Sequence, residues 1–123
     1  MKIFVLLGCV FALIGVAAGA FGAHALGDRV DGRMLEIWQT GVQYQMYHAL
    51  ALFAAAWLYQ QTEATAALVG GWSFAAGILV FSGSLYLIVL TGMRSLGAIT
   101  PIGGVAMMVG WICCIVAALK LAG

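Results

Sequence analysis

Two histidines, His24 and His48, are the side chains of this sequence best suited to chemistry near neutral pH. Each lies in or beside an apolar stretch. A polar side chain is costly there and usually faces the interior of a helix bundle or takes part in a function. Histidines from neighbouring helices could ligate a b-type haem or a divalent metal. Two histidines without a nearby carboxylate or cysteine provide too few ligands for a typical metal site. We therefore favour a hydrogen-bonded histidine pair that holds the helix ends together.

Further polar side chains accompany the histidines at helical spacing. Tyr44 lies four residues before His48, so the two share a helix face, and Ser82 and Tyr86 share another face for the same reason. Antiparallel helices would bring all these groups to one end of the protein, as a candidate functional cluster. Its members are His24, Gln43, Tyr44, Gln45, His48, Ser82, Tyr86 and Thr100.

The groups that catalysis would need are missing from the apolar stretches. No Asp or Glu lies within them, which leaves a proton-coupled exporter without its carboxylate. Ser82 and Ser84 have neither a G-x-S-x-G motif nor an acidic partner. Cys9, Cys113 and Cys114 form no C-x-x-C pair, so we expect small buried apolar residues. The sequence therefore predicts a protein that is not an enzyme, with no metal and no cofactor.

Four apolar stretches must position the polar cluster. The first, residues 3–26, would extend about 36 Å as a helix, enough to cross a hydrocarbon core of about 30 Å. The chain has 123 residues, 65% hydrophobic and 7% charged, which leaves no room for a second domain. We predict an all-α, antiparallel bundle of four transmembrane helices in a single domain. The spans are residues 3–26, 43–59, 65–91 and 96–119.

The segments between the spans are short and polar. Residues 27–36 hold five of the nine charged side chains and must lie outside the hydrocarbon. Residues 34–45 are typical of an interfacial helix with Trp38 at headgroup depth. Lys and Arg are nearly balanced between the two sides, and the short positive start favours both termini in the cytoplasm. The first apolar run exceeds the roughly 15 residues of a secretory signal, so we expect that helix to be retained.

Glycines recur three and four residues apart in the first stretch and return in the later ones. Such positions let helix backbones approach closely in a membrane. A small chain with this much close-packing surface is expected to form a homo-oligomer or to serve as an accessory subunit of a membrane complex. The expected packing positions are Gly15, Gly19, Gly22, Gly83, Gly103 and Gly104.

Four motifs in order resemble a known family over nearly the whole chain. They are Gly19-Ala20-Phe21-Gly22-Ala23-His24, Gln43-Tyr44-Gln45 followed by His48, Phe81-Ser82-Gly83-Ser84-Leu85-Tyr86, and Thr100-Pro101-Ile102-Gly103-Gly104. The sequence resembles the family of the small bacterial inner-membrane protein YgdD, an uncharacterised family with eukaryotic members. The resemblance implies four transmembrane helices in a bacterial inner membrane and brings no catalytic residues.

Two classes of function remain open. The first is a structural or accessory membrane protein that acts through helix and lipid contacts, with membrane lipid as its partner. The second is a small channel or transporter with a polar vestibule formed by His24, Gln45, His48, Tyr86 and Thr100. A histidine-ligated haem or metal protein is less favoured. The net charge of +1 shows no basic face for nucleic acid, so no nucleic-acid partner is expected.

Overall fold

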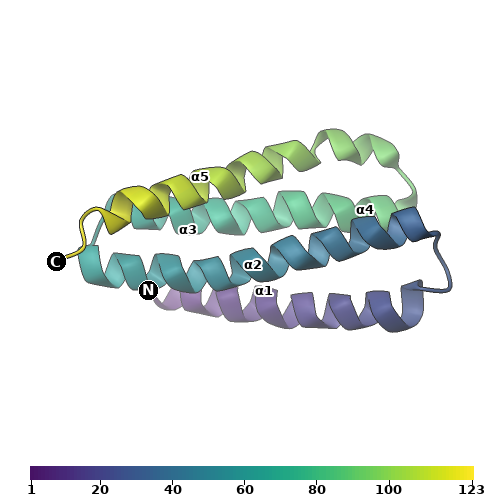
Figure 1. Ribbon diagram of the computed structural model, residues 1–123, viewed down its shortest axis with the longest axis horizontal. Helices are drawn as coiled ribbons and strands as arrows, with labels where there is room; N and C mark the ends of the chain where they lie inside the picture. Colours follow the sequence, from purple (N-terminus) through teal and green to yellow (C-terminus); the bar gives the residue numbers. More distant parts are fainter.

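The computed structural model describes residues 1–123, and the chain is helical apart from short turns. The helical elements form four rods. Figure 1 shows the rods lying side by side, with the chain reversing direction between successive rods. The rods are, in order, α1 (Lys2–Phe21) with the π-helical η1 (Gly22–Leu26); α2 (Gly32–Thr62); α3 (Thr65–Gly77), the π-helical η2 (Ile78–Ser82) and α4 (Gly83–Thr91); and the 3₁₀-helical η3 (Arg94–Ala98) with α5 (Thr100–Ala118).

Three rods are long and apolar enough to cross a membrane: Lys2–Leu26, Thr65–Thr91 and Arg94–Ala118. They match the predicted spans 3–26, 65–91 and 96–119 to within two residues at each end, and the all-α prediction is confirmed. Pro101 lies in the first turn of α5, where its missing N–H costs least. The second rod, α2, has 31 residues and is long enough, but it is more polar than the other three.

The helix that contains the predicted second span, 43–59, extends beyond it at both ends. A single helix runs from Gly32 to Thr62, so residues 34–45, expected as an interfacial helix that leads into the span, are continuous with it. The helix begins early because Asp31 caps it, accepting a hydrogen bond from Met34 N at 2.8 Å. It ends where Glu63 adopts a left-handed conformation with φ of 53°.

The α1 rod packs mainly on α2, along a face of glycines seven residues apart. A Cβ atom on Gly15 would lie 2.5 Å from Met46 Sδ, and one on Gly22 would lie 2.6 Å from Trp38 Cδ1. Gly19 is less tightly packed, with its nearest neighbour 3.4 Å from such an atom. The two helices therefore touch backbone to side chain along most of α1.

A second glycine contact joins α3 to α5. A Cβ on Gly70 would lie 3.1 Å from the carbonyl oxygen of Gly110, and the reverse distance is also 3.1 Å. Two turns further along the helix, a Cβ on Gly77 would lie equally close to the carbonyl oxygen of Gly103. Gly83 was expected to be a packing position, but no atom lies within 4 Å of where its Cβ would be.

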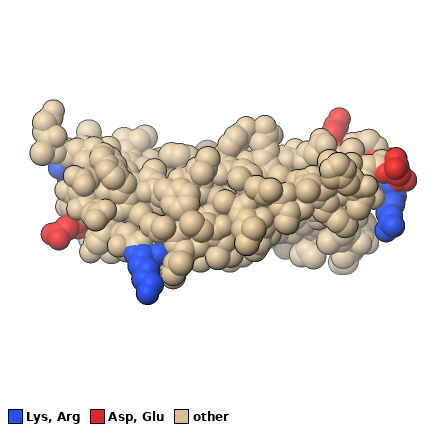
Figure 2. All heavy atoms as spheres, turned by 90° about the horizontal axis from the view of Figure 1, so that it is seen from below, with Lys and Arg blue, Asp and Glu red and all other residues tan.

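Charged side chains gather near the two ends of the bundle. Figure 2 shows this on one face, with an uncharged band of tan atoms between the ends. The interior is filled by apolar side chains, of which Phe4, Leu52 and Phe74 are fully buried. A long apolar waist with charged ends has the polarity that a bilayer requires.

Gly103 and Gly104 give a matched test of the close contact at α5. A Cβ on Gly103 would lie 2.8 Å from Phe81 Cα, whereas one on Gly104 has its nearest neighbour at 3.8 Å. We expect Gly103→Ala to lower the free energy of unfolding by about 1–3 kcal/mol through overpacking. Gly104→Ala is expected to be neutral or slightly stabilising, because alanine favours helix. Unfolding in mixed micelles measures both; equal stabilities would contradict the contact.

Candidate functional site: the interior polar network

Gln45 ties three rods together from the interior of α2. Its side chain is 2% exposed. The amide Nε2 donates to the carbonyl oxygen of Phe11 in α1 at 2.8 Å, and Oε1 accepts from Tyr86 Oη of α4 at 2.6 Å. A helical carbonyl has a second lone pair, so Phe11 can accept this bond without unwinding α1. The glutamine amide thus donates to the backbone of α1 and accepts from a side chain of α4.

Two serines of the third rod bind the helices on either side. Ser82 Oγ donates to the carbonyl oxygen of Gly41 in α2 at 2.6 Å. Ser84 Oγ donates to the carbonyl of Phe81 at 2.9 Å and lies 2.6 Å from Thr100 Oγ1 at the start of α5. Because the single proton of Ser84 is directed at Phe81, Thr100 is the donor in the hydroxyl pair.

His48 has both ring nitrogens occupied by other groups of the chain. Nδ1 lies 2.7 Å from the carbonyl oxygen of Tyr44, which can only accept, so this nitrogen carries the proton. Nε2 is then the acceptor for Trp111 Nε1 of α5, at 3.0 Å. The ring also packs against Phe74, with centroids 5.6 Å apart. No nitrogen lone pair is left to ligate a metal, and no group of three His, Cys, Asp or Glu side chains gathers anywhere in the chain.

The expected pair of His24 and His48 does not form. His24 is exposed in η1 and makes no hydrogen bond within the chain. Gly22 of η1 lies against Trp38, whereas His48 is ten residues further along α2, about 15 Å away along the axis. The expectation of equal depth is wrong because α2 begins at Gly32, so residues near 38 rather than near 48 face η1.

The cluster expected at one end is instead spread from the loop end to the middle of the bundle. Gln45 meets Tyr86, and Thr100 joins through Ser84, while Ser82 bonds to backbone. Gln43 is exposed and unbonded, and the Tyr44 side chain makes no hydrogen bond, although its ring lies 4.9 Å from that of Phe81.

Two tryptophans belong to the network and were not expected there. Trp38, expected at headgroup depth, is buried and donates from Nε1 to the carbonyl oxygen of Ala18 at 2.8 Å. A signal for it exists in the sequence: Trp38, Gly41, Gln45 and His48 follow spacings of three, four and three, which marks one inward helix face. Trp111 carries no such signal because it lies beside, and not on, the buried face of α5 that Met107, Gly110 and Cys114 form.

The polar network leaves no buried side-chain group without a partner. Every buried side-chain nitrogen and oxygen has a hydrogen-bond partner. Each bond among Gln45, Tyr86, Ser82, His48 and Trp111 described above joins a side chain to another rod or to its own helix backbone. What this arrangement can do chemically is fix the helices against one another.

Residues 18–104 match the family described as "Protein of unknown function (DUF423)". The chain belongs to the DUF423 family. It is 49% identical over 121 residues to the UPF0382 membrane protein YwdK of Bacillus subtilis, covering 98% of each chain. It is 46% identical over the whole of both chains to a UPF0382 membrane protein of Staphylococcus epidermidis and to SAB0533 of Staphylococcus aureus. No solved structure matches the chain.

The comparisons confirm an uncharacterised membrane family and correct its name. They give DUF423 and relatives such as YwdK, and they do not support YgdD. The names of the relatives, with three rods able to span a bilayer, identify the DUF423 protein as a membrane protein. The matched segment contains the polar network except for Phe11 and Trp111.

The bond between Gln45 and Tyr86 can be measured in a double-mutant cycle. Tyr86→Phe leaves the buried Gln45 Oε1 without its donor, an expected cost of about 1–3 kcal/mol of unfolding free energy. With Gln45→Leu as the second change, the coupling energy should be about 0.6 kcal/mol, up to about 1.7, as for other hydrogen bonds between membrane helices. Tyr47→Phe, at an exposed position, is the control. Strict additivity of the two changes would contradict the bond.

The occupied nitrogens of His48 predict that the protein binds no haem. Purified protein incubated with hemin should show no stoichiometric Soret band, and His48→Leu should cost about 1 kcal/mol by leaving Trp111 Nε1 without its acceptor. His24→Leu should change stability little, because that ring is exposed and unbonded. A Soret band that disappears in either variant would overturn the assignment.

Proposed function

We propose that this DUF423 protein is a structural or accessory protein of the bacterial inner (cytoplasmic) membrane, not an enzyme, that acts through helix and lipid contacts. One observation carries the proposal: every buried polar side-chain atom is partnered within the chain. The outward surfaces of the rods are apolar, as a protein that meets other helices and lipid tails requires. No cofactor or nucleic acid has a part in this role.

The proposed arrangement is an antiparallel bundle in which all four rods cross the bilayer and both termini lie in the cytoplasm. Of the four rods, α2 is the most polar and is therefore the least obvious membrane span. Its polar side chains Gln45 and His48 are buried and hydrogen-bonded, so lipid does not meet them. Its exposed positions near mid-length include Tyr47 and Leu50. A helix whose polar groups are satisfied inside a bundle can span despite a modest hydropathy.

The same pairing argues against a channel or transporter. Gln45, His48 and Tyr86 were expected to line a vestibule, and each is hydrogen-bonded to a partner inside the chain. Proteoliposomes of the protein should show no ion flux above that of empty vesicles. A flux that Gln45→Leu abolishes would favour the channel instead.

The outer face of α1 is where we propose that the protein meets a second copy or a larger complex. The helix packs mainly on α2, and the rest of its surface is open and apolar. Leu13 is 71% exposed at its centre, and Val16 is exposed one turn away. Such a face can be covered by another helix with little steric cost.

Cysteine cross-linking in native membranes tests this face. In a Cys9→Ala background, Leu13→Cys should give disulfide-linked dimers, or a linked partner of another mass, at least several times more efficiently than controls. Phe4→Cys is the buried control on the same helix, and Leu119→Cys, at an 81% exposed position after α5, reports random collision. Equal yields from positions 13 and 119 would count against an interface on α1.

A further inference from the structure

A groove runs along the bundle between α2 and the third and fourth rods. At the loop end it is a hollow of about 410 Å³ that lies between Ile37 of α2 and Leu85 of α4. A second hollow of about 370 Å³ lies between Tyr44 of α2 and Met107 of α5. Phe81 of η2 lines both hollows, so the two adjoin at this side chain and together make up the groove.

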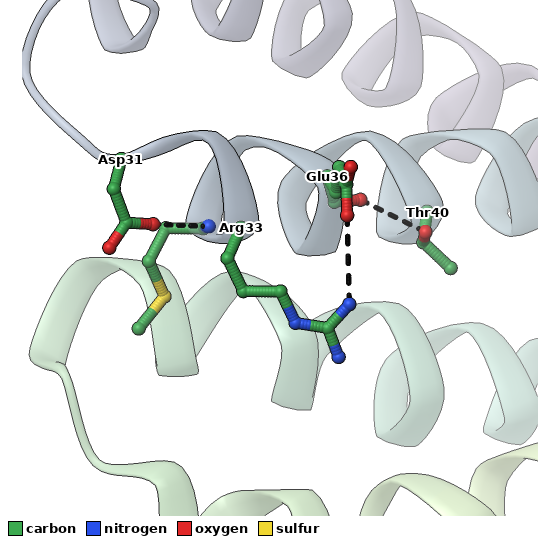
Figure 3. A network of polar contacts seen from close by, with 5 residues as sticks. Asp31, Arg33, Glu36 and Thr40 are labelled. Atoms are coloured by element: carbon green, nitrogen blue, oxygen red, sulfur yellow. Dashed lines mark hydrogen bonds and ion pairs between the residues drawn. The ribbon is translucent and has the colours of Figure 1, made fainter.

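Two arginines flank the mouth of the groove from different rods. Arg33 lies in the first turn of α2, and Arg94 begins η3. The one acidic residue that lines this region is Glu36, 3.6 Å from Arg33, and both side chains are at least 70% exposed. Figure 3 shows that Asp31 is turned instead to the start of α2, where it bonds to Met34 N.

The mouth therefore has an excess positive charge. An ion pair as exposed as that of Arg33 and Glu36 contributes little, so the guanidinium stays available to another anion. Arg94 makes no ion pair at all. Arginine forks match the oxygens of a phosphate in a bidentate way, which a single lysine ammonium cannot do.

The lining of the groove changes along its length from charged to mainly apolar, as a phospholipid does from its headgroup to its acyl chains. On α2 its lining runs from Arg33 through Ile37, Thr40 and Tyr44 to His48, which spans about 22 Å along the helix. One leaflet of the hydrocarbon core is about 15 Å deep, half of the full thickness. The groove is thus long enough for one acyl chain and its headgroup.

We propose that this groove binds one acidic phospholipid, with its phosphate between Arg33 and Arg94 and one acyl chain over Phe81. Basic pockets between membrane helices recognise acidic headgroups in this way. A zwitterionic lipid brings the same phosphate together with a cation that the two arginines repel. The inference rests on the proposed membrane role and adds to it a specific lipid at a specific place.

Lipid retention measured by native mass spectrometry tests the site. The full chain is released from nanodiscs made of equal phosphatidylglycerol and phosphatidylcholine, and the retained lipids are counted. We expect phosphatidylglycerol to be preferred, and Arg94→Gln or Arg33→Gln to lower the preference about fivefold each. Arg29→Gln, at the same end but outside the groove, is the matched control. Gly104→Leu, which fills the groove beside Phe81, should lower retention without changing charge.

Three results would overturn the lipid site. They are equal retention of the two lipids, an equal loss in Arg29→Gln, and disulfide dimers through Met108→Cys, which would show that a second copy covers the groove. Cross-linking through position 13 is read in the same membranes. If this cross-link persists while the lipid preference is absent, the groove proposal fails and the proposed function stands. If the lipid preference is present while the cross-link is absent, the lipid site stands and the proposed interface on α1 fails.

Discussion

Backbone contact between α3 and α5 is the constraint on which the rest of the bundle depends. Lipid tails are as apolar as the helix surfaces, so burial from water does not drive these rods together and close packing must do so. Contact energy falls steeply when a gap opens, and glycine allows the nearest approach. With Gly70 against Gly110 and Gly77 against Gly103, α5 lies close enough for Trp111 to reach His48 and for Thr100 to reach Ser84.

The π-helical segment η2 directs the third rod toward two different neighbours. Gly77, just before it, faces α5, whereas Ser82 at its end donates to α2. A turn with more residues rotates the following helix relative to the preceding one, so one rod can present small residues to one partner and hydroxyls to another. Phe81 lies on this segment, with its backbone against Gly103 and its ring lining the groove beside α2.

Much of the fold could be predicted from the sequence because long apolar runs have few alternatives in a membrane. The runs ending near Leu26, Thr91 and Ala118 located three rods to within two residues. The second span was placed from residue 43, although its helix begins at Gly32, where Asp31 caps it. An error in that start shifts every contact of the helix, and this is why His24 was paired with His48 rather than placed near Trp38. Partners such as Trp111 depend on helix rotation, which spacing within one segment does not define.

The buried polarity of α2 has a consequence for how the chain enters the membrane. In the proposed arrangement Gln45 needs Tyr86, and His48 needs Trp111, which is synthesised after almost all of the chain. When α2 leaves the ribosome, Gln45 has Phe11 of α1 but not yet Tyr86, and His48 has the Tyr44 carbonyl oxygen but not yet Trp111. Unpartnered polar groups in hydrocarbon oppose insertion. Stable integration of α2 must therefore await the last two rods, so that biogenesis of this small protein is a late, concerted event rather than a helix-by-helix one.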